Sequence, residues 1–290
     1  MKSNNCEVRT TAPPPSSGAE KIIGLVGDLP AMPHIAAQVV QKLANPDSTP
    51  QEIHELISKD QSLAARVLKM ANSPLYGASR GVSSIKEAVI FMGFDTIGSL
   101  IMTSVMKDMT ATAGKSGKSL WEHSICCAVG ARHIGRNLGY QRVEEIFLAA
   151  LMHDIGKSVL FLQIPDIMGQ VVSSVNGGKS FPEAERELLG FAHMEAGRLL
   201  AQNWQFPLAM VDAVANHHEP DCAATAGELT HIVSIANILC HKLSIGLTKR
   251  PEIDPFELQS AKELGVSDKL ISETLIIINN ASFNKKPNVN

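Results

Sequence analysis

One short segment of the 290-residue chain contains a histidine, an aspartate and a lysine, side chains that could together carry out phosphate chemistry. His153-Asp154 is followed by Ile155-Gly156-Lys157, so an imidazole and a carboxylate leave the end of a predicted helix together. An imidazole nitrogen and a carboxylate oxygen both suit divalent ions, and the pair could serve one metal site. Lys157 lies one turn further on and could hold a phosphate oxygen as a point charge. The predicted chemistry is metal-assisted hydrolysis of a phosphate ester.

Four further histidines stand in order around this segment: His123 precedes it, and His193, His217 and His218 follow it. They are candidate metal ligands together with His153 and Asp154. The alternative for all six is a hydrogen-bonded polar network inside the core, and the alternative for Lys157 is a solvated lysine at a helix end. The remaining histidines are expected at surface or boundary positions, namely His34, His54, His133, His231 and His241.

The composition favours packed helices over sheets. Hydrophobic residues make up 44% of the chain and aromatic residues only 4%, so aliphatic side chains must fill the core. A net charge of -3 and the absence of a basic run argue against a nucleic-acid partner. No apolar stretch approaches the roughly 18 residues that a membrane span needs. The five cysteines form no regular framework, and a cytoplasmic location is predicted.

Changes in composition suggest the domain boundaries. Residues 1–20 include a Thr/Pro/Ser/Gly stretch and are expected to be a disordered tail, as are residues 284–290. Residues 110–119 read TATAGKSGKS, which is typical of a linker. We therefore expect a helical N-terminal subdomain over residues 21–109, packed on a second helical domain over residues 120–283.

Helix start signals support an all-α fold. Thr49-Pro50-Gln51-Glu52 combines an N-cap residue, a proline at the first helical position and the acidic residue of a capping box. Ser119-Leu120-Trp121-Glu122 repeats the capping-box pattern and is expected to open the helix that carries His123. Further helices are expected near residues 143–153, 181–189, 193–203, 207–217 and 228–243.

The segment from His153 to Lys157 resembles the signature of the HD phosphohydrolase superfamily. That resemblance implies a metal held by a first histidine at His123, by the His153-Asp154 pair and by a later aspartate. Asn237 stands at the position of that aspartate, and an amide is a much poorer ligand. His193, His217 and His218 resemble the extra ligands of the cyclic-dinucleotide hydrolases called HD-GYP proteins.

The Gly-Tyr-Pro segment of the HD-GYP enzymes has no counterpart after His217-His218-Glu219-Pro220, where the chain reads Asp221-Cys222-Ala223-Ala224. This argues against hydrolysis of cyclic di-GMP. Several segments instead resemble the HDOD family over roughly residues 25–244. They are Leu29-Pro30-Ala31-Met32-Pro33, Ile57-Ser58-Lys59-Asp60, Leu68-Lys69-Met70-Ala71-Asn72-Ser73, Ala88-Val89-Ile90-Phe91-Met92-Gly93 and Trp204-Gln205-Phe206-Pro207. The HDOD resemblance implies an all-helical fold with an HD-like core, in a family regarded as regulatory in bacterial signalling.

These observations favour a non-catalytic signal-transduction module that acts through signalling proteins and requires no cofactor. A bound divalent metal (Fe, Mn, Zn or Ni) stays open, because six candidate ligands remain without the aspartate at position 237. The main alternative is a metal-dependent phosphohydrolase acting on a nucleotide or another small phosphate ester. A third interpretation is a pocket that binds a small phosphate ligand without turnover. The sequence leaves the oligomeric state open.

Overall fold

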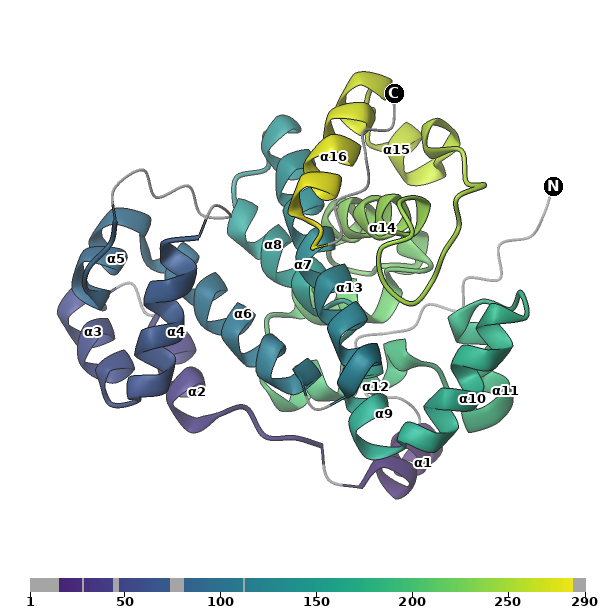
Figure 1. Cartoon of the computed structure of the whole chain (residues 1–290), viewed down its shortest axis with the longest axis horizontal. Coiled ribbons are helices and arrows are strands. Elements are labelled where there is room, and N and C mark those ends of the chain that lie inside the picture. The colour runs from purple at the N-terminus through teal and green to yellow at the C-terminus, as the bar shows by residue number, and fades with distance from the viewer. Residues whose placement is uncertain (1–15, 28, 44–46, 74–80, 112, 284–290) are drawn as a thin grey trace. The chain divides into compact units, whose positions relative to one another are not determined.

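The computed structural model describes residues 16–27, 29–43, 47–73, 81–111 and 113–283, and no β-strand occurs among them. The predicted all-α fold is confirmed (Figure 1). Two compact units divide the chain, the first formed by residues 1–30 together with 109–290 and the second by residues 31–108. Within the described part of the chain, no helix has both the length and the apolar character that a bilayer crossing needs.

The second unit is built from α2 (His34–Leu43), α3 (Pro50–Ser58), α4 (Gln61–Ala71), α5 (Ile85–Met92) and most of α6 (Phe94–Ala111). The capping box predicted at Thr49 and Glu52 is present, since the Thr49 side chain accepts from the Glu52 N–H while the Glu52 carboxylate accepts from the Thr49 N–H. Helix α3 packs against α2, α4 and α5, and its Ile53 and Ile57 are buried. The periodic apolar residues of the short helices thus form the core of this unit.

The first unit contains the remaining elements, which carry all the candidate site residues. They are α1 (Ser16–Val26), α7 (Gly114–Asn137), α8 (Val143–Met152), α9 (Ile155–Gln163), α10 (Pro165–Asn176), α11 (Phe181–Leu189), α12 (His193–Asn203), α13 (Leu208–Asn216), η2 (Pro220–Cys222), α14 (Gly227–Lys242), η3 (Pro255–Glu257), α15 (Gln259–Glu263) and α16 (Asp268–Ala281). The long helix α7 packs against α8, α14 and α16, while α12 packs against both α9 and α13. These contacts bring the ends of α8, α12 and α13 towards α7 and α14.

The segment before residue 31 was expected to be a tail over residues 1–20 followed by the start of the N-terminal subdomain, and the structure places it differently. Residues 16–20, expected in a tail, form the start of α1, and residues 1–15 lie outside the described residues, as does the expected tail at 284–290. Ile22 of α1 is buried in the same apolar cluster as Leu160 and Phe181, and the Trp204 indole N–H donates to the Pro30 carbonyl at 2.9 Å. The segment before residue 31 therefore belongs to the unit that carries the histidines, where Ile22 is buried and Leu29 packs against the same apolar cluster.

The expected linker at residues 110–119 is mostly helical. Helix α6 continues to Ala111 and α7 already begins at Gly114, five residues before the predicted capping box at Ser119. A Cβ atom on Gly117 would lie 1.8 Å from the Thr110 carbonyl oxygen, so this glycine permits a close approach of two backbone segments. Glu122 does not cap a helix start, since its carboxylate accepts from the Ser282 hydroxyl and the Phe283 N–H. Residues 110–119 resemble a linker because glycine serves both purposes: it makes a chain flexible, and it lets two backbone segments pack closely.

Candidate metal centre

Two of the candidate histidines are oriented by the ends of the helices that precede them. His153 follows the last residue of α8, and its Nδ1 lies 2.7 Å from the carbonyl oxygen of Ala150. His217 follows α13 in the same way, with Nδ1 3.0 Å from the Val214 carbonyl oxygen. The last carbonyls of a helix lack partners within the helix, so an Nδ1–H that donates to them satisfies a backbone group and fixes the ring. The Nε2 atom of each ring is then left for the centre.

His123 and His193 are oriented by partners from distant or neighbouring elements. The Nδ1 of His123, on α7, lies 3.1 Å from the carbonyl oxygen of Ile245. The Nδ1 of His193, the first residue of α12, lies 2.6 Å from Glu185 Oε2, which also accepts the backbone N–H of His193 at 2.8 Å. Metal-binding histidines usually have such an acceptor on the second ring nitrogen, which fixes the tautomer and the orientation.

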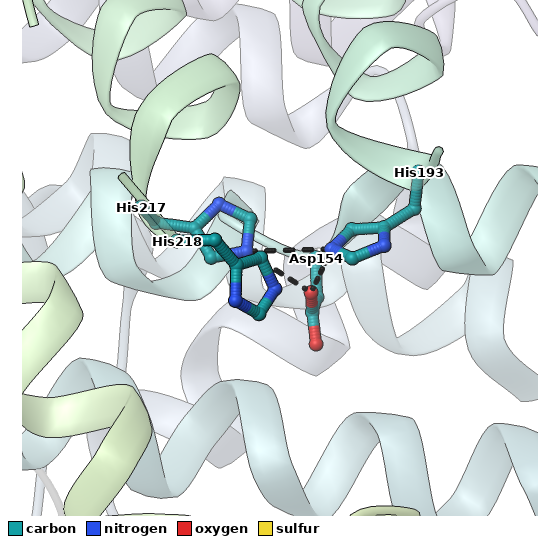
Figure 2. Close-up of side chains that lie close together, drawn as sticks. All are labelled: Asp154, His193, His217 and His218. Carbon is teal, nitrogen blue, oxygen red and sulfur yellow. Dashed lines mark hydrogen bonds and ion pairs between the residues drawn. The ribbon is translucent and has the colours of Figure 1, made fainter. Parts of the chain in front are cut away.

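The four Nε2 atoms converge on one carboxylate, that of Asp154, which lies between α8 and α9. Oδ2 of Asp154 is 3.6 Å from His123 Nε2 and 3.5 Å from His153 Nε2. Oδ1 is 3.2 Å from His193 Nε2 and 3.6 Å from His217 Nε2. Figure 2 shows how the His193 ring approaches the carboxylate from one side and the His217 and His218 rings from the other. All four histidines and Asp154 are buried, with at most 3% of each exposed.

The potential ligand atoms form two groups that share Asp154, and in each group they lie within 4.8 Å of one another. One group is Asp154, His193, His217 and His218, and the other is His123, His153 and Asp154. Metal bonds of 2.0–2.2 Å place tetrahedral ligand atoms about 3.4 Å apart, which matches the separations around the carboxylate. Asp154 Oδ1 and His218 Nε2 are buried and make no well-aligned hydrogen bond with the described residues. The donor set and its spacing therefore fit a divalent metal ion.

Lys157 lies inside this centre and is almost wholly buried, at 3% exposure. Its ammonium donates to Asp154 Oδ2 at 2.7 Å, one turn along α9. The same ammonium lies 4.6 Å from the centre of the Phe181 ring, a distance at which a cation is attracted to an aromatic face. The ammonium therefore supplies a positive charge directly to the carboxylate on which the histidines converge.

The charges in the centre shift the pKa values of its members in opposite directions. Burial would raise the pKa of Asp154, but Lys157 and His153 outweigh it and hold that pKa well below its usual value. Burial would lower the pKa of His153, but the Asp154 carboxylate raises it to about 9. For His193 the effect of burial is likewise outweighed, chiefly by Glu185, and the pKa is raised. A carboxylate is thus kept ionised and two imidazoles are favoured in their charged form.

The other imidazoles are favoured in the neutral form that binds metals. Burial, together with the neighbouring charge of His153, lowers the pKa of His123 to about 4. Burial is also the main cause that lowers the pKa of His217 to about 3 and that of His218 and His241 well below the usual value. Rings favoured in the neutral form and rings favoured in the charged form thus lie around one carboxylate, because the protonation of one ring disfavours that of its neighbours.

Asn237 is buried on α14, with 2% exposed. Its Oδ1 atom accepts no hydrogen bond from the residues that the structure describes. A neutral amide at this position leaves Asp154 as the sole carboxylate among the seven positions proposed from the sequence. The negative charge of Asp154 is compensated by the Lys157 ammonium, which donates to its Oδ2.

Two residues that contact histidines of the centre were not predicted from the sequence. Glu185 orients His193, and it shares the buried face of α11 with Phe181, Ala184 and Leu189, where a carboxylate is unexpected. That position within an apolar face was the available signal. His241 was expected at a surface or boundary position but is only 8% exposed, and its ring stacks on that of His123 with centroids 5.2 Å apart. It lies one turn after Asn237, on the same side of α14.

His231 was also expected near the surface and is 9% exposed. It lies on the buried helix α14 and contacts residues other than the His–Asp centre. One small cavity borders the His–Asp centre. A cavity of about 10 Å³ is bordered by Leu120, His123, Asp154, Lys157, His241, Leu247 and Thr248.

Comparison with known proteins identifies the family. The family model of the HDOD domain matches residues 29–220, about two thirds of the chain. The chain belongs to the HDOD domain family. The crystal structure of an HDOD domain protein of unknown function from Geobacter sulfurreducens is similar over 92% of this chain and 98% of that chain, with a TM-score of 0.79 and 29% sequence identity.

Two curated proteins are similar to this HDOD chain over parts of their length. An uncharacterised protein of Treponema pallidum is 23% identical over 269 residues, which is 90% of this chain and 52% of the relative. Ribonuclease Y of Thermus thermophilus is 33% identical over 109 residues, which is 38% of this chain and 14% of the relative. The HDOD chain therefore spans about half of the first relative and a small part of the second.

Proposed function

We propose that this HDOD protein is a non-catalytic regulatory module that acts through signalling proteins, and that its His–Asp centre holds the core of the domain together. The observation that carries the proposal is the size of the cavity at the centre, about 10 Å³. That volume is close to the minimum for one water molecule, whereas sites for small molecules usually measure about 300–1,000 Å³. This cavity, which borders His123, Asp154, Lys157 and His241, is therefore smaller than a phosphate ester requires.

The charge of the centre supports the same proposal. Hydrolysis by one or two divalent ions benefits from several anionic ligands, but Asn237 is neutral and Asp154 is shared with the Lys157 ammonium at 2.7 Å. Lys157 was a candidate for a phosphate contact. Its ammonium is instead committed to Asp154, which leaves less positive charge for a small phosphate ligand.

A divalent metal remains compatible with this regulatory function. Asp154 with His193, His217 and His218 would hold one ion, and His123 and His153 would hold a second ion that competes with Lys157 for Asp154 Oδ2. When bound, such an ion supplies Lewis acidity and lowers the pKa of a coordinated water. Fe, Mn, Zn and Ni all accept imidazole and carboxylate ligands. In our proposal a bound ion stabilises the fold, and the regulatory function does not require it.

The alternative is a metal-dependent phosphohydrolase, and one observation favours it. Four histidines have Nδ1 engaged by an acceptor and Nε2 directed at Asp154, an arrangement suited to metal binding. Catalysis would require the elements around the cavity to open and admit a nucleotide or another small phosphate ester.

Two measurements on untagged protein separate these functions. The first is the metal content of the wild type and of the double variant His153→Ala/Asp154→Ala, by elemental analysis. The second is release of phosphate from mono- and diesters in the presence of Mn²⁺, Fe²⁺, Zn²⁺ or Ni²⁺. We expect no turnover in any metal-loaded sample. Turnover by the wild type that disappears in Asp154→Asn would establish the phosphohydrolase and contradict our proposal.

The regulatory function itself can be tested in cells. The double variant Asp154→Asn/Lys157→Met removes both charges of the buried pair and keeps the side-chain shapes similar. If the module acts without catalysis, this folded variant restores the phenotype of a deletion strain and is cross-linked to the same protein partners as the wild type. A folded double variant that loses both properties would contradict the proposal.

A further inference from the structure

A second cluster of metal-binding side chains lies outside the His–Asp centre. His231 on α14 faces Asp221 of η2 and Glu263, the last residue of α15. His231 Nε2 is 3.1 Å from Glu263 Oε2 and 3.5 Å from Asp221 Oδ1. All three potential ligand atoms lie within 4.8 Å of one another. None of these residues takes part in the site described above.

The separations in this cluster are longer than good hydrogen bonds between charged groups. An N–H of a protonated imidazole would be expected about 2.7–2.9 Å from a carboxylate oxygen. A single proton on Nε2 can also serve only one of the two carboxylates well. A zinc ion with bonds of 2.0–2.2 Å places its tetrahedral ligands about 3.4 Å apart, and so would contact both carboxylates and the imidazole at once.

The orientation of His231 provides an independent observation. Its Nδ1 lies 3.0 Å from the hydroxyl oxygen of Ser260, and both residues are buried, His231 with 9% and Ser260 with 7% exposed. The Ser260 hydroxyl is able to accept a hydrogen bond from Nδ1–H, and an acceptor on the second ring nitrogen is the usual support for a histidine that binds a metal through the other nitrogen. His231 is thus held with Nε2 towards the two carboxylates, while Asp221 is 57% and Glu263 is 35% exposed to solvent.

We propose that Asp221, His231 and Glu263 form a binding site for a divalent transition-metal ion of the zinc class, open to solvent. Two carboxylates and one neutral imidazole balance the charge of the ion and leave a fourth position for water. The ion links η2, α14 and α15. Because η2 follows His217 and His218 within a few residues, the ion also restrains the segment that carries these two histidines.

Zinc titration of chelator-treated full-length protein tests this site, with ZnCl₂ as the probe. We compare the wild type with Asp221→Asn and Glu263→Gln, and use Glu257→Gln as the matched control. Glu257 is 69% exposed and pairs with Lys262 in the same region, but does not contact His231. All substitutions are at exposed carboxylates, and circular dichroism verifies that each variant is folded.

The expected result is one Zn²⁺ equivalent that the wild type and Glu257→Gln bind and that the two cluster variants bind at least about tenfold more weakly. The zinc-induced rise in the thermal midpoint should decrease in the same two variants. Any zinc bound by the His–Asp centre should be the same in all four proteins, because none of the substitutions changes that centre. A loss of zinc in the two cluster variants is therefore assigned to the second site. Identical zinc stoichiometry and affinity in all four proteins, or no zinc bound by the wild type, would overturn the proposal.

Discussion

Single side chains decide the charge of the His–Asp centre. Asp154 receives the Lys157 ammonium on Oδ2 and lies near histidine nitrogens on both oxygens, so neighbouring side chains compensate much of its negative charge. Burial of an ion pair costs desolvation energy, which is recovered only while both partners and their hydrogen bonds are present. The effect of a substitution here therefore depends on whether its partner is changed as well.

Replacement of Lys157 alone by methionine should be strongly destabilising. The variant leaves a buried carboxylate without its ammonium, and we expect the free energy of unfolding to fall by about 3 kcal/mol. Adding Asp154→Asn should recover part of this loss, since both charges are then absent. Urea denaturation followed by tryptophan fluorescence measures the effect. Strictly additive losses from the two substitutions would show that the pair is not coupled.

Substitution of Glu185 tests the orientation of His193. Glu185→Gln keeps the shape of the side chain but removes the charge that holds the imidazole, and we expect a loss of about 1–3 kcal/mol in stability. If the centre binds a metal, affinity should fall by roughly 10–100-fold. Glu187→Gln on the same helix is the control, because Glu187 is 60% exposed and pairs with a surface lysine. Equal stability of the two variants would contradict the positioning role of Glu185.

At the scale of elements, the centre depends on the close approach of α9 and α12. A Cβ atom on Gly156 would lie 1.9 Å from the His193 carbonyl oxygen and 2.8 Å from the Gly197 nitrogen. These are backbone atoms of the helix that begins with a candidate ligand, and they cannot move away independently. The glycine after His153-Asp154-Ile155 thus sets the distance between the carboxylate and His193.

Gly156→Ala should therefore destabilise the first unit severely, by more than about 3 kcal/mol, or prevent its folding. Gly169→Ala on α10 is the matched control, because nothing lies within 4 Å of its added Cβ. Alanine has the higher helix propensity, so the control should gain up to about 1 kcal/mol. Thermal unfolding monitored by circular dichroism compares the two. A stable Gly156→Ala variant with an unchanged midpoint would refute the close contact.

Local sequence patterns predicted the helices well because caps and periodicity act within a few residues. The capping box at Thr49 and the helix over residues 181–189 appear as expected. The first turns of α7 were missed because Gly117 has the composition of a linker but is selected by contact with the Thr110 backbone. This contact joins the end of α6 to the start of α7, and the composition of the segment alone does not reveal it.

The candidate site could be predicted in part, because several of its residues form a recognisable pattern along the sequence. His153, Asp154 and the other ordered histidines form a pattern along the chain, and the structure brings all of them together. Glu185 and His241 could be placed only once α11 and α14 were packed, since each acts on a histidine of another element. The burial of Lys157 was equally hidden, because a lysine one turn after an aspartate is most often exposed.

For the whole first unit, the buried histidines predict an unusual dependence of stability on pH. The pKa values of His123 and His217 are lowered to about 4 and about 3, while the unfolded chain titrates near pH 6.5. Between these values the unfolded chain binds more protons, so stability falls as the pH decreases from 6.5 towards 4. His153, with its pKa raised to about 9, has the opposite effect: its contribution is complete below pH 6.5 and is lost as the pH rises through 9.

Stability of the first unit should therefore be greatest near pH 7. Both tryptophans of the chain, Trp121 and Trp204, lie in this unit, so fluorescence reports its unfolding directly. Urea denaturation from pH 4.5 to 9.5 measures the profile. His241→Phe keeps a ring on His123 but removes one histidine of lowered pKa, and should reduce the acid-side slope by up to about 1.4 kcal/mol per pH unit. An unchanged slope would contradict the assignment of His241.

The return of the N-terminal segment to the histidine-bearing unit has a consequence for biosynthesis. Helix α1 leaves the ribosome before the second unit, whereas Leu160 and Phe181, which lie in the same apolar cluster as its Ile22, are synthesised only after that unit. The contacts that define the second unit lie within residues 31–108, and contacts between residues close in sequence form early. We expect this inserted unit to fold during translation, while the apolar side chains of α1 are still without their packing partners. The His–Asp centre should form last, after α12, α13 and α14 have been synthesised.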